Sequence, residues 1–121
     1  MLRGDWSAHS GYELGRQLLD KPEATAVFVA NDQMALGLLR RLHEINRDKP
    51  RQISIVGFDD IPEAGYFTPP LTTVRQDFAE VGRRCIHLLL GQIEGSVKSK
   101  EHALVPIQLI LRQSTATAKA R

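Results

Sequence analysis

Short apolar runs and amphipathic stretches alternate along this chain. Thr25 to Ala30 (TAVFVA) is continuously apolar, which is typical of a short strand buried on both faces of a parallel sheet. The next stretch, to about Ile45, repeats apolar residues at helical spacing: Ala35, Leu38, Leu39, Leu42 and Ile45. After a polar turn comes a second apolar run, Ile53 to Val56. Strand, helix and strand with short connections predict a crossover unit of a parallel sheet.

A further helix is expected upstream, from about Ser7 to Leu19. Either Ser7 or Ser10 suits its N-cap, and Ser10 with Glu13 matches a capping box. Gly11 and Gly15, four residues apart, lie on one face of this helix. Because interior glycines weaken a helix, we expect close backbone packing there against a sheet or a partner.

Downstream, the pattern predicts two more strands and one helix. Gly57 breaks the second apolar run, and Leu71 to Val74 is the next strand candidate. Asp77 and Glu80 form a capping-box pattern ahead of a helix to about Ile93. His102 to Leu111 is a last strand region, interrupted by Pro106. We expect the polar, aperiodic Gln113 to Arg121 to be frayed or disordered.

This order of elements predicts an α/β fold with a parallel sheet flanked by helices. The last helix and strand have no obvious partners among the other elements. We therefore expect the chain to be a piece of a larger α/β unit.

Composition agrees with a soluble globular domain of 121 residues, with 42% hydrophobic and 25% charged residues. No apolar run is long enough to cross a bilayer, and the first residues lack a signal-peptide core. A net charge of +2 is too small to indicate nucleic-acid binding by this segment. The single cysteine, Cys85, excludes an internal disulfide, and we expect it as a buried, inert thiol on an apolar helical face.

Polar side chains follow two of the predicted parallel strands. Asn31 comes directly after TAVFVA, and Asp59 shortly after ISIV. Ligands of open parallel sheets bind beyond the carboxyl ends of the strands. Trp6 and Phe78, each in a loop beside a helix start, add flat apolar surfaces. Amide, carboxylate and aromatic faces together favour a sugar as the ligand.

Each of these residues also has a purely structural interpretation. Asn31 and Asp32 suit a helix cap, and for Asp32 the cap is favoured. Asp59 suits a ligand contact and its own turn equally, whereas Asp60 is better explained by the turn. Trp6 also fits a core or interface anchor, and Phe78, at the start of an apolar helical stripe, also fits the core.

Signs of catalysis and of a cofactor are missing from the sequence. There is no glycine-rich phosphate loop, nucleophile elbow or thiol–histidine arrangement. The histidines are scattered without metal-ligand spacing. The residues therefore favour a ligand-binding protein that is not an enzyme and has no cofactor or metal.

Four motifs together closely resemble the LacI/GalR family of bacterial transcription regulators, and most of all its lactose repressor-like members. The match runs from Gly4 to about Thr115. The motifs are GDWSAHSGYELG (4–15), VFVANDQMALGLLR (27–40), ISIVGFDD (53–60) and PPLTTVRQDFAEVGRR (69–84).

The resemblance implies a periplasmic-binding-protein-like effector domain of two lobes, of which this chain is the C-terminal part. Residues 1–75 would belong to the C-terminal lobe, and residues 76–104 would form the hinge and a helix of the N-terminal lobe. Residues 105–115 would return as a strand, and 116–121 would be a disordered tail.

The resemblance also assigns residues to roles. The effector contacts would be Trp6, Asn31, Asp59 and Phe78, with a sugar or glycoside as effector. The partner would be a second copy in a homodimer, through Ala8, Gly11, Tyr12, Ala35, Leu36, Arg40, Tyr66 and Phe67. Operator DNA would be bound only by an N-terminal helix-turn-helix absent from this chain, in the cytoplasm and without a membrane. The alternative is a periplasmic sugar-binding transport receptor of the same fold.

Overall fold

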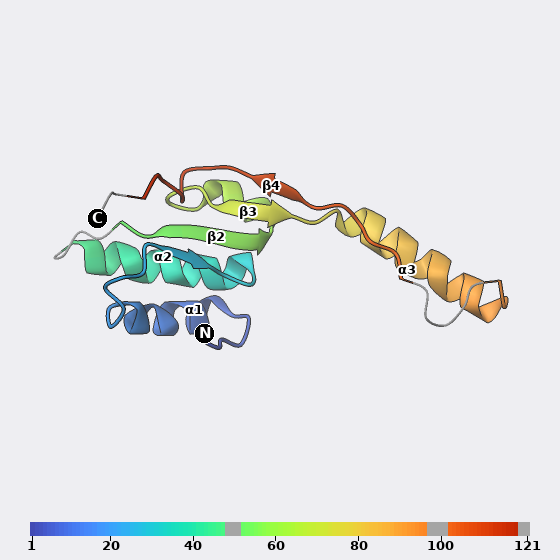
Figure 1. Cartoon of the computed structure of the whole chain (residues 1–121), viewed down its shortest axis with the longest axis horizontal. Coiled ribbons are helices and arrows are strands. Elements are labelled where there is room, and N and C mark those ends of the chain that lie inside the picture. Colours follow the sequence, from blue (N-terminus) through green and yellow to red (C-terminus); the bar gives the residue numbers. More distant parts are fainter. Residues whose placement is uncertain (48–51, 97–101, 119–121) are drawn as a thin grey trace. The chain divides into compact units, whose positions relative to one another are not determined.

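The computed structural model describes residues 1–47, 52–96 and 102–118. Its elements in chain order are α1 (Ala8–Leu14), the 3-10 helix η1 (Gly15–Leu18), β1 (Ala26–Phe28), α2 (Asp32–Asn46), β2 (Ser54–Asp59), the 3-10 helix η2 (Pro62–Tyr66), β3 (Thr72–Arg75), α3 (Phe78–Ile93) and β4 (Gln108–Ile110) (Figure 1). Among the described residues, no helix is long and apolar enough to span a bilayer.

The four strands form one sheet in the order β1-β2-β3-β4. β1, β2 and β3 are parallel, with Phe28 opposite Val56 and Asp59 opposite Arg75. The predicted α/β alternation and the parallel pairing are therefore confirmed. β4 runs back in the opposite direction beside β3, so the sheet is mixed (Figure 1).

The chain divides into two compact units. Unit 1 comprises Met1–Arg75 and Leu109–Arg121, and unit 2 comprises Gln76–Gln108. The chain thus leaves unit 1 after Arg75 and returns to it at Leu109.

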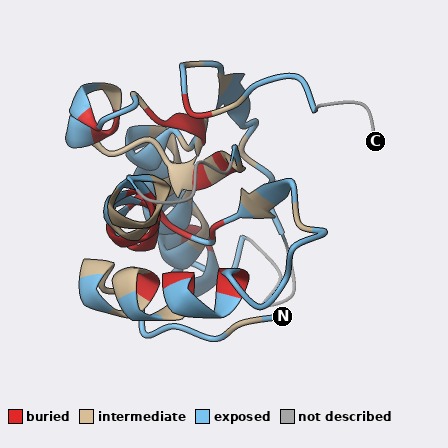
Figure 2. Ribbon diagram, turned by 90° about the vertical axis from the view of Figure 1, so that its left-hand side faces the viewer, coloured by how far each residue is buried: buried red, intermediate tan, exposed pale blue. Residues whose placement is uncertain are grey.

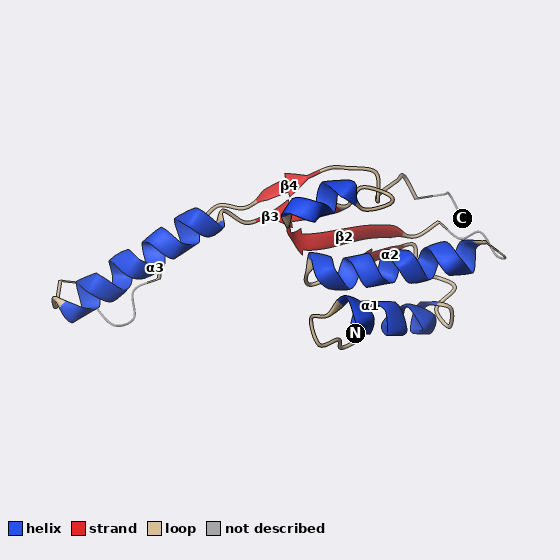
Figure 3. Cartoon of the chain, turned by 180° about the vertical axis from the view of Figure 1, so that it is seen from behind, coloured by secondary structure: helices blue, strands red, loops and turns tan. Residues whose placement is uncertain are grey.

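The core of unit 1 lies where α2 meets the sheet. α2 packs against β2, and α1 lies on the other side of α2 (Figure 3). Buried positions occur along α1, α2 and the strands (Figure 2). The buried apolar side chains are Leu18, Val29, Met34, Ala35, Leu38, Leu39, Leu42, Ile55, Ala64, Phe67 and Leu71.

α1 and α2 touch backbone to backbone. A Cβ built on Gly11 would lie 2.0 Å from the Met34 carbonyl oxygen, and one on Gly37 only 1.8 Å from that of Ala8. The expected close approach at Gly11 is real, but its partner is helix α2 and not a sheet. Ser7 is the N-cap of α1, and its hydroxyl accepts from the amide of Ser10 at 3.1 Å.

Two expectations about the strands were wrong. β1 is not buried on both faces, since it is an edge strand and Phe28 is 64% exposed. The second apolar run was also expected to break at Gly57, but β2 continues through this glycine to Asp59. A Cβ on Gly57 would meet the Asp32 carboxylate, so the glycine permits packing inside the strand.

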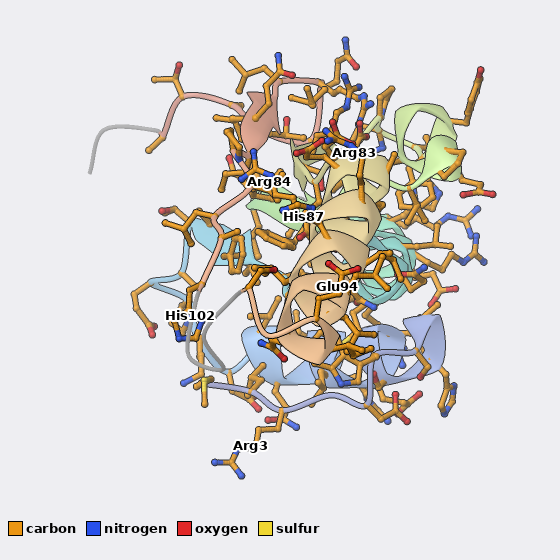
Figure 4. All side chains as sticks on the ribbon, turned by 90° about the vertical axis from the view of Figure 1, so that its right-hand side faces the viewer. Arg3, Arg83, Arg84, His87, Glu94 and His102 are labelled. Atoms are coloured by element: carbon orange, nitrogen blue, oxygen red, sulfur yellow. The ribbon has the colours of Figure 1, made fainter. Side chains whose placement is uncertain are left out.

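Unit 2 is built around α3. Asp77 caps the helix by accepting from the amide of Glu80 at 2.9 Å, as predicted. Arg84 donates to the Leu104 carbonyl at 2.6 Å and so ties α3 to the chain beyond it. Arg83, Arg84, His87 and Glu94 project from this helix in Figure 4.

The apolar stripe of α3 is largely uncovered within this chain. Phe78, Ile86, Leu89, Leu90 and Ile93 are each more than half exposed. Cys85 is also exposed, so the expectation of a buried thiol was wrong. The predicted helix is confirmed, but no other element among the described residues covers its apolar stripe.

The segment after β4 is ordered by hydrogen bonds, contrary to the expected fraying from Gln113. The Ser114 hydroxyl donates to the Ile55 carbonyl at 2.6 Å and accepts from the Thr72 amide at 2.7 Å. The Ala116 amide donates to the Ser54 hydroxyl at 3.1 Å. β4 itself is shorter than the expected strand, because only Gln108–Ile110 pair after Pro106. Residues 119–121 of the expected tail, residues 48–51 of the polar turn expected before Ile53, and residues 97–101 lie outside the described residues.

Candidate functional site

Asn31 is the N-cap of α2 and also holds the loop that carries Trp6. Its Oδ1 accepts from the Met34 amide at 3.0 Å, and its Nδ2 donates to the Trp6 carbonyl at 2.9 Å. The side chain is buried, with 7% exposure. The cap of α2 is therefore Asn31, and not Asp32 as expected.

The Trp6 loop is fixed by Asp5 on its other side. Oδ1 of Asp5 accepts from the Ser7 amide at 3.0 Å, and the Asp5 amide donates to the Ser10 hydroxyl at 3.1 Å. Hydrogen bonds from the Ser7 hydroxyl and amide lower the pKa of Asp5 to about 2. Trp6 itself has a left-handed backbone, φ 74°, and is 64% exposed. Its indole is thus presented to solvent from a hydrogen-bonded loop.

Asp59 ends β2 in an unusual conformation. Its φ is 110°, and that of Asp60 is 58°, so two consecutive non-glycine residues have positive φ. Such conformations cost on the order of 1–3 kcal/mol each and persist only where surrounding contacts hold them.

Asp32 supplies one of those contacts from the first turn of α2. It is fully buried, and its carboxylate accepts from the Thr73 hydroxyl at 2.6 Å and from the Ile61 amide at 2.9 Å. Burial raises the pKa of Asp32, and the neighbouring Asp59 and Asp60 raise it further, although both hydrogen bonds oppose the shift. Asp32 therefore anchors the chain just after the Asp59-Asp60 pair.

Asp60 supplies the other contact, so turn geometry alone does not explain this residue. Its Oδ2 lies 2.6 Å from Nε of Arg75, and its Oδ1 lies 2.8 Å from Nη2 of Arg112. Burial raises the pKa of Asp60, but the two arginines outweigh it and leave the pKa below its ordinary value. Neither Asp32 nor Asp60 was recognised from sequence, because their partners are 15 to 52 residues away and follow no local pattern.

The sheet brings Asn31 and Asp59 to the same edge. β1 and β2 are parallel neighbours with Phe28 opposite Val56, and each candidate lies three residues beyond its member of that pair. The Asn31 side chain is hydrogen-bonded to the Trp6 carbonyl. The side of unit 1 at the carboxyl ends of the strands therefore carries one amide, one carboxylate and one exposed indole. Phe78, the fourth candidate, is the first residue of α3 in unit 2 and is 56% exposed.

The residues expected at a subunit contact differ in exposure. Tyr66 is 89% and Leu36 42% exposed, and Arg40 is also exposed. Ala8 and Tyr12 are half-buried, and the Tyr12 hydroxyl donates to Glu44 at 2.8 Å. Gly11, Ala35 and Phe67 are buried inside the chain, where they serve its own packing. A hollow of about 300 Å³ lies on this surface, lined by Leu36, Leu39, Arg40, His43, Tyr66, Phe67 and Thr68.

Within the described residues, no group of three or more histidine, cysteine or acidic side chains is arranged to hold a metal ion. The chemistry that unit 1 offers at the strand ends is hydrogen bonding and aromatic contact.

Residues 2–115 match the model of the periplasmic binding protein-like domain family. The chain belongs to this family. Among curated members, the lactose operon repressor of Klebsiella pneumoniae is 44% identical over 112 residues, which are 92% of this chain and 31% of that protein. The CytR repressor of Escherichia coli (strain K12) is 40% identical over 116 residues, which are 95% of this chain and 34% of the length of CytR. The chain thus spans about a third of the length of these relatives.

Solved structures of LacI-family regulators show the same fold. A LacI family regulator from Enterococcus faecalis V583 with bound ribose has a TM-score of 0.83 and 37% identity, covering 98% of this chain and 44% of that one. The resemblance to LacI-type regulators, first drawn from four motifs, is confirmed.

Proposed function

We propose that this chain is the effector-binding and dimerisation region of a LacI-type DNA-binding regulator, and that its effector is a sugar or glycoside. The observation that carries the proposal is the placement of Asn31 and Asp59 at the carboxyl ends of two neighbouring parallel strands, where Asn31 is also hydrogen-bonded to the Trp6 carbonyl. Hydroxyl groups of a sugar suit the amide and carboxylate, and its apolar ring face suits the indole.

The relatives support the regulatory role. The lactose operon repressor and CytR are named as repressors, and solved relatives hold ribose or cellobiose. These names favour a regulator over a transport receptor. We place the protein in the cytoplasm, where operator DNA would be bound by a helix-turn-helix outside this chain.

The proposed mechanism uses the two units. The C-terminal lobe would comprise residues 1–75 and the return strand 105–115, most of which belong to unit 1. Residues 76–104 would contribute Phe78 and α3 to the N-terminal lobe. A sugar that binds one arrangement of the lobes more tightly than the other would shift their populations, and with them operator affinity.

The test is calorimetry and operator binding on the complete protein. Methyl β-galactoside, ribose and cellobiose are titrated into the wild type and into Asp59→Ala, Trp6→Ala and a control, Asp20→Ala. We expect one sugar to bind the wild type and control, and both site variants to lose the sugar response while retaining operator affinity. A normal sugar response in both site variants would refute the site.

A further inference from the structure

We propose that Asp60 is a positioning residue that fastens the two chain segments joining the units and thereby holds Asp59 in place. The fastening stands on the geometry of unit 1 alone. The consequence for Asp59 rests on the proposed function.

The first step is the arrangement of the charges. Asp60 has a side-chain exposure of only 6% and meets Arg75 at 2.6 Å and Arg112 at 2.8 Å through different oxygens. Arg75 is 50% exposed and Arg112 20% exposed. One nearly buried carboxylate thus bridges two guanidinium groups through charge-assisted contacts, which are stronger than contacts between neutral groups.

The second step is where the two arginines lie along the chain. Arg75 is the last residue of unit 1 before the chain leaves, and Arg112 comes three residues after its return at Leu109. Arg112 also donates from Nη1 to the Leu71 carbonyl at 2.8 Å, and from its amide to the Thr72 hydroxyl at 2.9 Å. The outgoing and returning segments are therefore both fixed to the loop after β2.

The third step concerns Asp59. It is the last residue of β2 and precedes Asp60, and both residues have positive φ. Asp60 is held by the arginines, and the following Ile61 amide is held by Asp32. With both positions fixed, the backbone of Asp59 cannot relax to a right-handed conformation. Release of Asp60 would allow that relaxation and would reorient the Asp59 carboxylate.

The first arm of the test measures amide hydrogen exchange in the complete protein. In Asp60→Asn, we expect exchange to accelerate about tenfold or more at residues 73–77 and 109–113 and to stay unchanged in α2, because only the fastened segments lose contacts. Asp20→Asn, at an exposed turn, is the control. Asp60→Glu, which keeps the charge, should recover part of the protection. Unchanged exchange at both segments in Asp60→Asn would overturn the fastening.

Should Asp60→Asn fail to fold, Arg112→Lys is the second variant, because it keeps the charge but loses the two-armed contact. It should accelerate exchange at residues 109–113, and wild-type protection there would equally overturn the proposal.

The second arm measures affinity for methyl β-galactoside, ribose and cellobiose by calorimetry. We expect Asp60→Asn to weaken the binding seen in the wild type by about tenfold, and Asp60→Glu to restore part of it. Wild-type affinity together with accelerated exchange would overturn the link to Asp59. If the wild type binds none of the three sugars, the proposed function and the link to Asp59 are both rejected, while the exchange result still decides the fastening.

Discussion

Gly57 lies directly against Asp32, so that a Cβ on the glycine would stand 2.3 Å from the carboxylate Oδ1 and 2.8 Å from Cδ2 of Leu71. The glycine is in the middle of β2, and the carboxylate is in the first turn of α2. Their contact lets the buried carboxylate reach across β2 to the Thr73 hydroxyl. The start of α2 is thereby fixed to the sheet.

A methyl group at this position should therefore be costly. We expect Gly57→Ala to lower the free energy of unfolding by about 1–3 kcal/mol, because the Asp32 carboxylate and Leu71 must shift. Urea denaturation followed by circular dichroism measures the change. Gly65→Ala is the matched control, since its new Cβ would be 3.6 Å or more from its nearest neighbour. Equal stability of the two variants would show that the contact does not constrain the fold.

The glycine contact between the helices gives a second prediction. We expect Gly11→Ala to lower the free energy of unfolding by about 1–3 kcal/mol, because the methyl group would displace α1 from the Met34 backbone. A Cβ added at Gly82 in α3 would meet no described atom within 4 Å beyond its chain neighbours and its own helix backbone, so Gly82→Ala should raise helix stability by about 0.5–1 kcal/mol. Thermal unfolding of both variants and of the wild type measures these changes in stability. A destabilised Gly82→Ala with an unaffected Gly11→Ala would contradict the helix packing.

Asp60 and Asp32 should respond to acid in opposite directions. The pKa of Asp60 is lowered below 3.8, so its stabilisation is present above that pH and is lost as the pH falls through the folded-state pKa. The pKa of Asp32 is raised above 3.8, so its contribution is fully present below 3.8 and is lost as the pH rises through the folded-state pKa.

Substitution of Asp60 separates its contribution to the pH dependence of stability from that of Asp32. We expect Asp60→Asn to cost about 1–3 kcal/mol at pH 7, and the difference from wild type to shrink as the pH is lowered below 3.8. Urea unfolding at a series of pH values measures it. A cost that stays constant down to pH 2 would show that the ion pairs do not produce the effect.

Leu36 tests the proposed dimer surface. Because this side chain is 42% exposed on α2 beside Tyr66, a charge placed there would be buried on association. We expect Leu36→Asp to give monomers in sedimentation experiments on the complete protein. Leu19→Asp is the control, since Leu19 is similarly exposed at 48% but lies outside the proposed surface. A dimer of wild-type strength in Leu36→Asp would reject this surface.

Much of the fold was predictable because its determinants are local. The apolar run at Val27, the periodicity of α2 and the cap at Asp77 each depend on residues within one element. The parallel pairing of the first two strands and the placement of Asn31 and Asp59 at their carboxyl ends followed from general rules of parallel sheets.

The remaining features depend on contacts between residues far apart in the sequence. The sequence around Ser114 resembles a small, polar tail, yet the Ser114 hydroxyl forms hydrogen bonds with the Ile55 carbonyl and the Thr72 amide. Asp60 looks like a turn residue until Arg75 and Arg112 are brought beside it. Cys85 was expected to be buried but is exposed. An amphipathic pattern shows which face of a helix is apolar, but not whether another element of the same chain packs against that face.

The position of Ser114 bears on how this protein is made. Its hydroxyl satisfies the Ile55 carbonyl and the Thr72 amide, and its carbonyl accepts from the Ile55 amide at 2.8 Å. Until the ribosome has polymerised Ser114, those groups of β2 and β3 lack this partner, although both strands are already translated. Unit 1 can therefore reach its complete hydrogen bonding only after the whole of unit 2 has been synthesised, and a nascent chain that ends before Ser114 leaves these groups of β2 and β3 without this partner.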